Sequence, residues 1–255
     1  MNKTEGAISV IRARVWGENF HDRLNHICQR NYPNGMHNCI ADALRSDEIE
    51  VSVSIFEDPE HGLTQEQLDA TDVLIWWSHS RNGEVSDEVV DRVCKRVLDG
   101  MGFIALHSAH GSKPFTRLMG TSGGLVWREA NEKERLWVVD PSHPIAEGVG
   151  RYFELEEEEM YGEHFDIPQP DELVFISWFE GGEVFRSGCT FRRSKGKIFY
   201  FRPGHEMHPT YHDKNVQRVI SNAVKWAKPV QTDRPNYWAN PEPLEPLKKP
   251  IRVYE

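Results

Sequence analysis

Three histidines stand after three separate strands that the sequence predicts. His79 and His107 each come just after an unbroken apolar run, and His205 comes shortly after a third one. Because ligands of an open α/β sheet bind outside the carboxyl ends of its strands, we expect these imidazoles at one edge of a sheet. They can bind a divalent metal such as zinc, or one can act as a general base while the others orient substrate. The alternative is that each histidine caps backbone groups or bridges to a carboxylate.

An acidic segment between residues 154 and 163 provides the second group of candidates. Its glutamate run, 156–159, is typical of a solvated face. At the end of that run, Glu159, Tyr161 and Glu163 bring carboxylates and a phenol together beside a glycine. Such groups hydrogen-bond sugar hydroxyls or move protons. Trp16, at the end of the first predicted strand, can stack on a pyranose face.

These features define the residues that we expect to carry the chemistry. The predicted catalytic residues are His107, His205 and Glu159, and the predicted metal ligands are His79, His107 and His205. The predicted substrate contacts are Trp16, His79, Tyr161, Glu163 and Arg202, the last of which directly follows a predicted strand.

Residue spacing argues against other kinds of site. His205 and His208 are three residues apart and precede a proline, whereas a metalloprotease helix carries its histidines four residues apart. Ser108 lies at an expected strand-to-helix turn, but a leucine and a histidine stand where a hydrolase elbow needs glycines. The His-x-Cys pairs at 26–28 and 37–39 lack a matching half-site, which leaves a structural zinc there as the weaker alternative.

Strands alternate with helices in the first half of the chain, and this alternation positions the histidines. Apolar runs predict four strands, at residues 7–16, 51–56, 72–77 and 103–106. A helix is expected over 36–44, and Thr64 opens a shorter one with a Thr-x-x-Gln capping box. Ser86 caps a helix whose valines repeat every four residues. Strand, helix and strand therefore form a right-handed βαβ unit.

After residue 120 the predicted strands follow one another without helices between them. They are expected at 135–139, 152–155, 173–179, 184–191 and 197–201, the last two forming a hairpin. Asp213 then caps a final helix with one apolar face. The sequence thus predicts an α/β fold with a mostly parallel central sheet and an antiparallel elaboration.

Composition limits the classes of partner. The 255-residue chain has a formal charge of −10, which argues against nucleic acid, and no apolar run approaches a membrane span. Its four cysteines are far apart and no apolar leader precedes the first strand, so we expect reduced thiols and a cytoplasmic location. Residues 229–255 contain six prolines and are expected to form an arm on the same domain or on a neighbouring subunit of a homo-oligomer.

Three stretches together resemble the ThuA-like trehalose-utilisation family. They are 102–109 (GFIALHSA), 159–161 (EMY) and 200–206 (YFRPGHE), and the resemblance extends over about residues 7–228. It implies one domain over 1–228, with the flavodoxin-like three-layer sandwich of class I glutamine amidotransferases. Those enzymes carry a cysteine nucleophile at the elbow and a later histidine–glutamate pair. Here His107 stands at the elbow, so the resemblance does not extend to amidotransferase chemistry.

The resemblance further implies a role in the utilisation of trehalose or a related disaccharide, on keto sugars that a partner dehydrogenase makes. A keto group next to a glycosidic bond acidifies the α-protons, so a base and an electrophile suffice for elimination or isomerisation. We therefore expect a sugar-acting lyase, isomerase or hydrolase that uses a metal or acid/base groups. The alternative hypothesis is a non-catalytic sugar-binding or regulatory module on the same fold.

Overall fold

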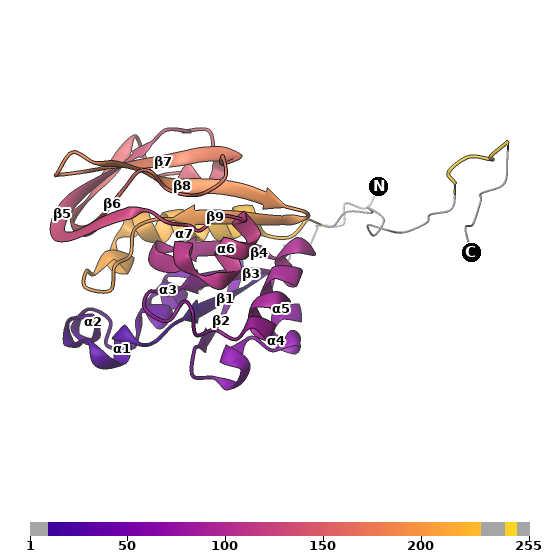
Figure 1. Cartoon of the computed structure of the whole chain (residues 1–255), viewed down its shortest axis with the longest axis horizontal. Helices are drawn as coiled ribbons and strands as arrows, with labels where there is room; N and C mark the ends of the chain where they lie inside the picture. Colours follow the sequence, from indigo (N-terminus) through magenta and orange to yellow (C-terminus); the bar gives the residue numbers. More distant parts are fainter. Residues whose placement is uncertain (1–9, 231–242, 249–255) are drawn as a thin grey trace.

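The structure is a computed structural model that describes residues 10–230 and 243–248 (Figure 1). Its nine-stranded sheet has the order β2-β1-β3-β4-β9-β8-β7-β5-β6. The strands are β1 (Ile11–Gly17), β2 (Ile49–Ile55), β3 (Val73–Trp77), β4 (Gly102–Leu106), β5 (Val126–Val138), β6 (Tyr152–Gly162), β7 (Glu172–Phe179), β8 (Val184–Arg193) and β9 (Gly196–Phe201). The α-helices are α1 (His21–Leu24), α2 (His26–Asn31), α3 (Met36–Leu44), α4 (Gln65–Asp69), α5 (Asp87–Leu98), α6 (Lys113–Met119) and α7 (Lys214–Ala227).

The parallel half of the sheet has apolar layers on both faces. Strands β2, β1, β3, β4 and β9 all run parallel. Helices α3 and α7 pack on one face, while α4, α5 and α6 pack on the other. Successive residues of β3 point to opposite layers, so Ile75 lies in the first layer and Trp76 in the second. This two-sided burial explains why the strand is apolar throughout.

The helices of this half begin where their capping residues predict. Thr64 and Gln67 form the predicted capping box at the start of α4. The Ser86 hydroxyl accepts from the Val89 N–H at the start of α5. Helix α3 spans the predicted residues 36–44. The sequence did not predict α1, α2 and α6, because helices of four to seven residues are too short for a 3.6-residue period to show.

The antiparallel half extends the sheet beyond β9, which pairs with β4 in parallel and with β8 in the antiparallel sense. Strands β8, β7, β5 and β6 form the upper part of Figure 1. Strands β5 and β6 are 13 and 11 residues long, much longer than predicted, because the middle of each is acidic rather than apolar. The prediction of a solvated face at 156–159 is corrected for Glu158 and Glu159, which are both buried.

Two predictions about the ends of the chain remain partly outside the described residues. The first predicted strand begins at residue 7, whereas the description begins at residue 10. Most of the predicted arm, residues 229–255, also falls outside, so its packing and its role in a homo-oligomer stay predictions. Of the helices in the described part of the chain, none is long and apolar enough to cross a membrane.

Candidate functional site

Three strand ends of the parallel half and one strand of the antiparallel half meet at a single cluster. His79 follows β3, His107 follows β4 and His205 follows β9, while Glu159 comes from β6. One ligand atom of each of the four residues lies within 4.8 Å of those of the others. The imidazole centroids of the three histidines are 5.4–5.9 Å apart. The structure therefore brings together all the predicted catalytic residues and metal ligands.

Three members of the cluster, His79, Glu159 and His205, line a cavity of about 460 Å³, which lies in the range of small-molecule sites. The fourth, His107, is completely buried and is not among the lining residues. Polar groups converge on it from several elements, and one aromatic side chain stands at its rim. Besides the cluster, the lining includes Asn82, Ser108, His110, Trp127, Glu129, Tyr161 and Glu206.

His107 is a fully buried, neutral imidazole whose protonated nitrogen can be identified. Its Nδ1 lies 3.1 Å from the carbonyl oxygen of Arg202, and since a carbonyl can only accept, Nδ1 carries the hydrogen. Burial, and secondarily the charge of Arg202, lowers the pKa of His107 well below its usual range. The neutral ring therefore has a lone pair on Nε2, which lies 3.3 Å from Glu159 Oε2 and 3.4 Å from the Tyr161 hydroxyl.

Glu159 Oε2 is buried, and the described residues offer it no hydrogen-bond donor. Its close neighbour, His107 Nε2, also presents a lone pair at 3.3 Å. Two electron-rich atoms facing each other out of contact with water repel unless a positive charge lies between them. The arrangement is thus suited to a shared proton or to a metal cation.

His205 has the opposite proton arrangement. The Met207 backbone N–H donates to His205 Nδ1 at 3.3 Å, so the neutral ring carries its hydrogen on Nε2. That Nε2 lies 3.7 Å from Glu206 Oε2 and 3.9 Å from Glu159 Oε2. Burial, together with His107, lowers the pKa of His205 to about 2. In this tautomer His205 presents an N–H rather than a lone pair to the cleft, so it is arranged to donate a hydrogen bond there.

The loop that carries His79 depends on a residue to which the sequence analysis gave no role. Glu18 is completely buried just after β1, and its carboxylate accepts the backbone N–H groups of His79 at 2.7 Å, Ser80 at 3.1 Å and Arg81 at 2.8 Å. The sequence held a usable signal, because Glu18 also follows a strand at the carboxyl edge of the sheet.

Two further residues near His79 were not predicted as site residues. His21 Nδ1 lies 3.2 Å from Glu206 Oε1, and both residues are close enough to His79 to form a second group of possible ligands. Burial raises the pKa of Glu206 to about 7. His21 lies in α1, a helix too short for the sequence to reveal.

Arg202, predicted as a substrate contact, does not line the cavity. It is completely buried beneath the cluster, where its guanidinium pairs with Glu134 at 2.5 Å and with Glu158 at 2.9 Å, and donates to the Glu159 carbonyl. Two carboxylates share one cation here, and burial raises the pKa of Glu134 to about 7. This network supports the backbone on which Glu159 stands.

Two other predicted substrate contacts, Trp16 and Glu163, also lie outside the cavity lining. Trp16 is 1% exposed, because it stacks on Trp76 with centroids 3.9 Å apart and lies in the apolar layer under α4 and α5. Glu163 is held by Arg186 at 2.8 Å and by the Phe165 N–H at 2.8 Å, and does not line the cavity. In both cases a strong competing partner occupies the side chain.

Tyr161 and Ser108 form a hydrogen bond with each other at the edge of the cavity. Their hydroxyls are 2.7 Å apart, and the Tyr161 ring stacks on His107 with centroids 5.1 Å apart. Within the described residues, no histidine hydrogen-bonds to Ser108, so the nucleophile–base contact of a serine hydrolase is not formed. This geometry agrees with the sequence argument against that hydrolase.

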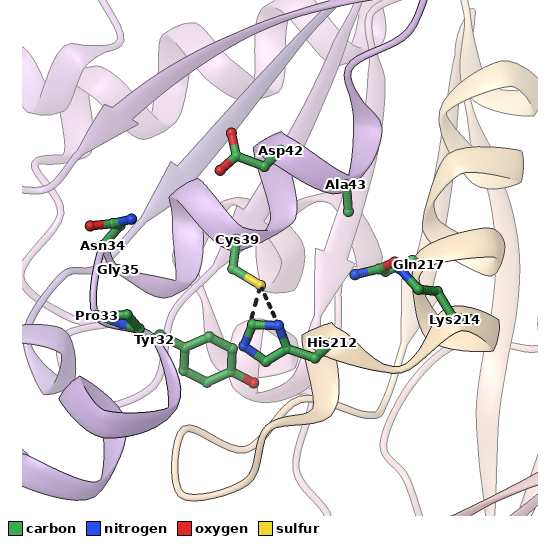
Figure 2. A pocket seen from close by; sticks show the side chains of 10 residues that line it. All are labelled: Tyr32, Pro33, Asn34, Gly35, Cys39, Asp42, Ala43, His212, Lys214 and Gln217. Atoms are coloured by element: carbon green, nitrogen blue, oxygen red, sulfur yellow. Dashed lines mark hydrogen bonds between the residues drawn. The ribbon is translucent and has the colours of Figure 1, made fainter.

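A second pocket, of about 360 Å³, lies between α3 and α7 (Figure 2). Cys39 Sγ points at the His212 ring, 3.7 Å from Nδ1. His212 Nε2 lies 2.9 Å from the Asn31 carbonyl, and the ring stacks on Tyr32. Burial raises the pKa of Cys39 to about 11, so its thiol is protonated near neutrality.

Comparisons with known proteins agree with this architecture. The sequence model of the ThuA family, described as trehalose utilisation, matches residues 21–227. Two ThuA-like proteins, from Parabacteroides merdae and Bacteroides uniformis, have TM-scores of 0.61 and 14% identity over 88% of this chain, covering 92% and 95% of their own chains. A cytoplasmic protein from Salmonella typhimurium LT2 has a TM-score of 0.55 and 12% identity, over 75% of this chain and 86% of its own. These identities show a shared fold alone. A search of curated proteins found no match.

Proposed function

The chain belongs to the ThuA family, described as trehalose utilisation, and on that premise we propose that it is an enzyme acting on a keto sugar in the histidine cleft. The substrate class is a disaccharide related to trehalose, oxidised at the ring carbon two positions from its glycosidic carbon. The reaction class is elimination or isomerisation through an enolate.

One observation carries this proposal. Glu159 Oε2 and His107 Nε2 face each other at 3.3 Å as two lone-pair atoms in a buried cleft. A folded protein keeps such a repulsive contact where a proton or cation is used, because the contact costs stability otherwise. His107 Nε2 can accept a hydrogen bond from the Tyr161 hydroxyl at 3.4 Å, whereas Glu159 Oε2 has no hydrogen-bond donor among the described residues.

The chain's own residues can carry the elimination. Glu159 Oε2 removes the proton from the carbon between the keto group and the glycosidic carbon, and the electron pair moves to the keto oxygen. When the enolate collapses, the glycosidic C–O bond breaks and the departing oxygen, which accepts a hydrogen bond from His205 Nε2, takes the proton that Glu159 removed. The products are an unsaturated keto sugar and an alcohol. Glu159 is thereby returned to its ionised form, and His205 keeps its hydrogen throughout.

A divalent metal such as zinc fits the other side of the cluster. His79, His107 and Glu159 would hold it, since two imidazoles and one carboxylate form a ligand set found in catalytic zinc sites. Bound there, it would polarise the keto oxygen. His205 would remain a hydrogen-bond donor whether or not a metal is present, because its Nδ1 accepts from the Met207 N–H.

We expect residues at the rim of the cavity, rather than the buried Trp16, to position the substrate. Trp127 on β5 is 64% exposed and lines the cavity, so its ring is available to stack on a sugar face. Asn82 and Glu129 line the same cavity and can hydrogen-bond sugar hydroxyls.

Turnover of 3-keto disaccharides by the full chain, before and after chelator treatment, tests the proposal together with metal analysis. We expect His205→Gln and Glu159→Gln to lower kcat by about 10²–10⁴-fold with substrate affinity retained. The matched control is His208→Gln, which replaces a buried histidine that does not line this cavity. If the variants lose affinity for the keto disaccharide and neither they nor the wild type turn it over, the sugar-binding module is favoured. A metal-free protein with full turnover would exclude the metal version.

A further inference from the structure

We propose that Glu206, His21 and Ser80 act as a positioning chain that holds the His79 ring in the tautomer with an unprotonated Nε2. The inference rests on the proposed function, in which His79 contributes that nitrogen to the cleft. Neither His21 nor Ser80 lines the cavity, so both would act through His79 rather than on substrate.

The chain consists of three consecutive contacts. Glu206 Oε1 lies 3.2 Å from His21 Nδ1. His21 Nε2 lies 2.9 Å from Ser80 Oγ, which in turn lies 3.1 Å from His79 Nδ1. The two rings pack edge to face, with centroids 5.0 Å apart at 84°. Both nitrogens of His21 are therefore engaged, and so is one nitrogen of His79.

The inventory of donors and acceptors sets the direction of the chain. An ionised Glu206 favours a hydrogen on His21 Nδ1, because a lone pair there would face negative charge at 3.2 Å. A neutral imidazole has one N–H, so His21 Nε2 accepts the hydroxyl hydrogen of Ser80. The Ser80 oxygen has then used its hydrogen and must accept from His79 Nδ1. The His79 hydrogen therefore resides on Nδ1, and Nε2 keeps its lone pair.

Burial and the backbone reinforce this arrangement. Glu206 is 3% exposed, so its contact with His21 Nδ1 at 3.2 Å is only weakly screened by solvent. The backbone N–H of His79 is held separately by Glu18 at 2.7 Å. The backbone and the ring of His79 are thus oriented by two different carboxylates, as histidines that ligate metals commonly require.

The same three groups could instead bind a second metal ion, since atoms of His21, His79 and Glu206 lie within 4.8 Å of one another. The Ser80 contacts favour the chain, because they already engage His21 Nε2 and His79 Nδ1. A second ion would have to displace these contacts. Metal stoichiometry therefore separates the two arrangements.

The direct test is the tautomer of His79 in the metal-free full chain. Long-range ¹H–¹⁵N correlations of labelled histidine, recorded above the pKa of Glu206, report which nitrogen carries hydrogen. The His79→Gln variant serves only to assign the signals. We expect His79 with hydrogen on Nδ1, and a mixture of tautomers in Ser80→Ala. Ser80→Thr keeps the hydroxyl and should restore the wild-type signal. Hydrogen on Nε2 in the wild type would overturn the chain.

Zinc titration gives a second readout. We expect Ser80→Ala to bind zinc about 10–100-fold more weakly than the wild type and Ser80→Thr to recover most of the affinity, as for other outer-sphere partners of metal ligands. Ser142→Ala, an exposed hydroxyl far from the cleft, is the matched control. Two zinc ions per protein molecule would contradict the proposed positioning chain and would favour a second metal site. If no zinc binds, the proposal that a metal takes part in the reaction fails. The tautomer of His79 then still tests the proposed positioning chain.

Discussion

The histidine cleft and the pocket between α3 and α7 contain similar groups in different states. Both have a volume of a few hundred Å³ and both contain imidazoles. In the pocket, both nitrogens of His212 have partners and the thiol of Cys39 stays protonated (Figure 2). In the cleft, oxygens of Glu159 and Glu206 are buried, and among the described residues they find no hydrogen-bond partner.

This difference shows that the size of a cavity does not identify a site. Buried polar groups in folded proteins nearly always find partners, so those that do not are held in place by the surrounding structure at a cost in stability. Two such atoms, Glu159 Oε2 and Glu206 Oε2, belong to residues that line the cleft. The following predictions test whether the two regions differ as much in energy and in function as they do in hydrogen bonding.

The largest expected effect is at Arg202, beneath the cleft. We expect Arg202→Met to lower the free energy of unfolding by about 3–5 kcal/mol, because Glu134 and Glu158 would remain buried without their cation. Urea unfolding measures this loss. Arg186→Met, which breaks the partly exposed pair with Glu163, is the control and should cost about 1 kcal/mol or less. Equal losses in the two variants would contradict the distinction.

Acid should destabilise the protein through the histidines of the cleft. Burial lowers the pKa of His110 from 6.5 to about 4. Between these pH values the unfolded chain binds a proton that the folded chain does not, so stability present above pH 6.5 is lost as the pH falls toward 4. The loss from His110 is on the order of 3 kcal/mol. Urea midpoints at both ends of this interval measure it, and His110→Gln should flatten the dependence. An unchanged slope in that variant would refute the assignment.

Trp127 should contribute to sugar binding without supporting the fold. We expect Trp127→Ala to weaken binding of a keto disaccharide by about 1 kcal/mol, which is roughly fivefold in Kd, with little change in stability. Calorimetric titration measures the affinity. Trp137→Ala, on the same strand but outside the cavity, is the control and should leave Kd unchanged. Comparable losses in both variants would argue that the strand as a whole, rather than the rim, determines affinity.

The smallest effect is expected in the second pocket. Cys39→Ser should change the free energy of unfolding by no more than about 0.5 kcal/mol and leave turnover unaffected, since the thiol is protonated and lies outside the histidine cleft. Turnover and urea unfolding of the same preparation check both statements. A large drop in turnover would show that the two regions are coupled or that the pocket is itself functional.

Much of the parallel half could be predicted from the sequence. The apolar run of β3 and the valine stripe of α5 are local patterns that burial on both faces of a sheet produces. Because parallel strands end at a common edge, the convergence of His79, His107 and His205 could also be predicted. These inferences need the order of elements along the chain and no knowledge of distant contacts.

The full length of the acidic strands β5 and β6, and the burial of their glutamates, could not be predicted from local patterns. Glu134 and Glu158 are interior residues because Arg202, far away in the sequence, neutralises them. An isolated glutamate run looks solvated, and its burial depends on a partner that the fold supplies. The same reason explains why the sequence did not place Trp16, Glu163 and Arg202 outside the cavity, since each side chain contacts a residue distant in the sequence.

By itself the sequence determined the α/β class, the positions of most strands along the chain and the edge at which three histidines meet. These properties follow from local apolar periodicity and chain direction. Only the tertiary structure decided which nitrogen of each imidazole carries the hydrogen, which carboxylates face the cleft and which aromatic ring stands at its rim. Those properties depend on hydrogen-bond partners such as the Arg202 carbonyl and the Met207 N–H. Such partners come within reach only when separate elements pack together.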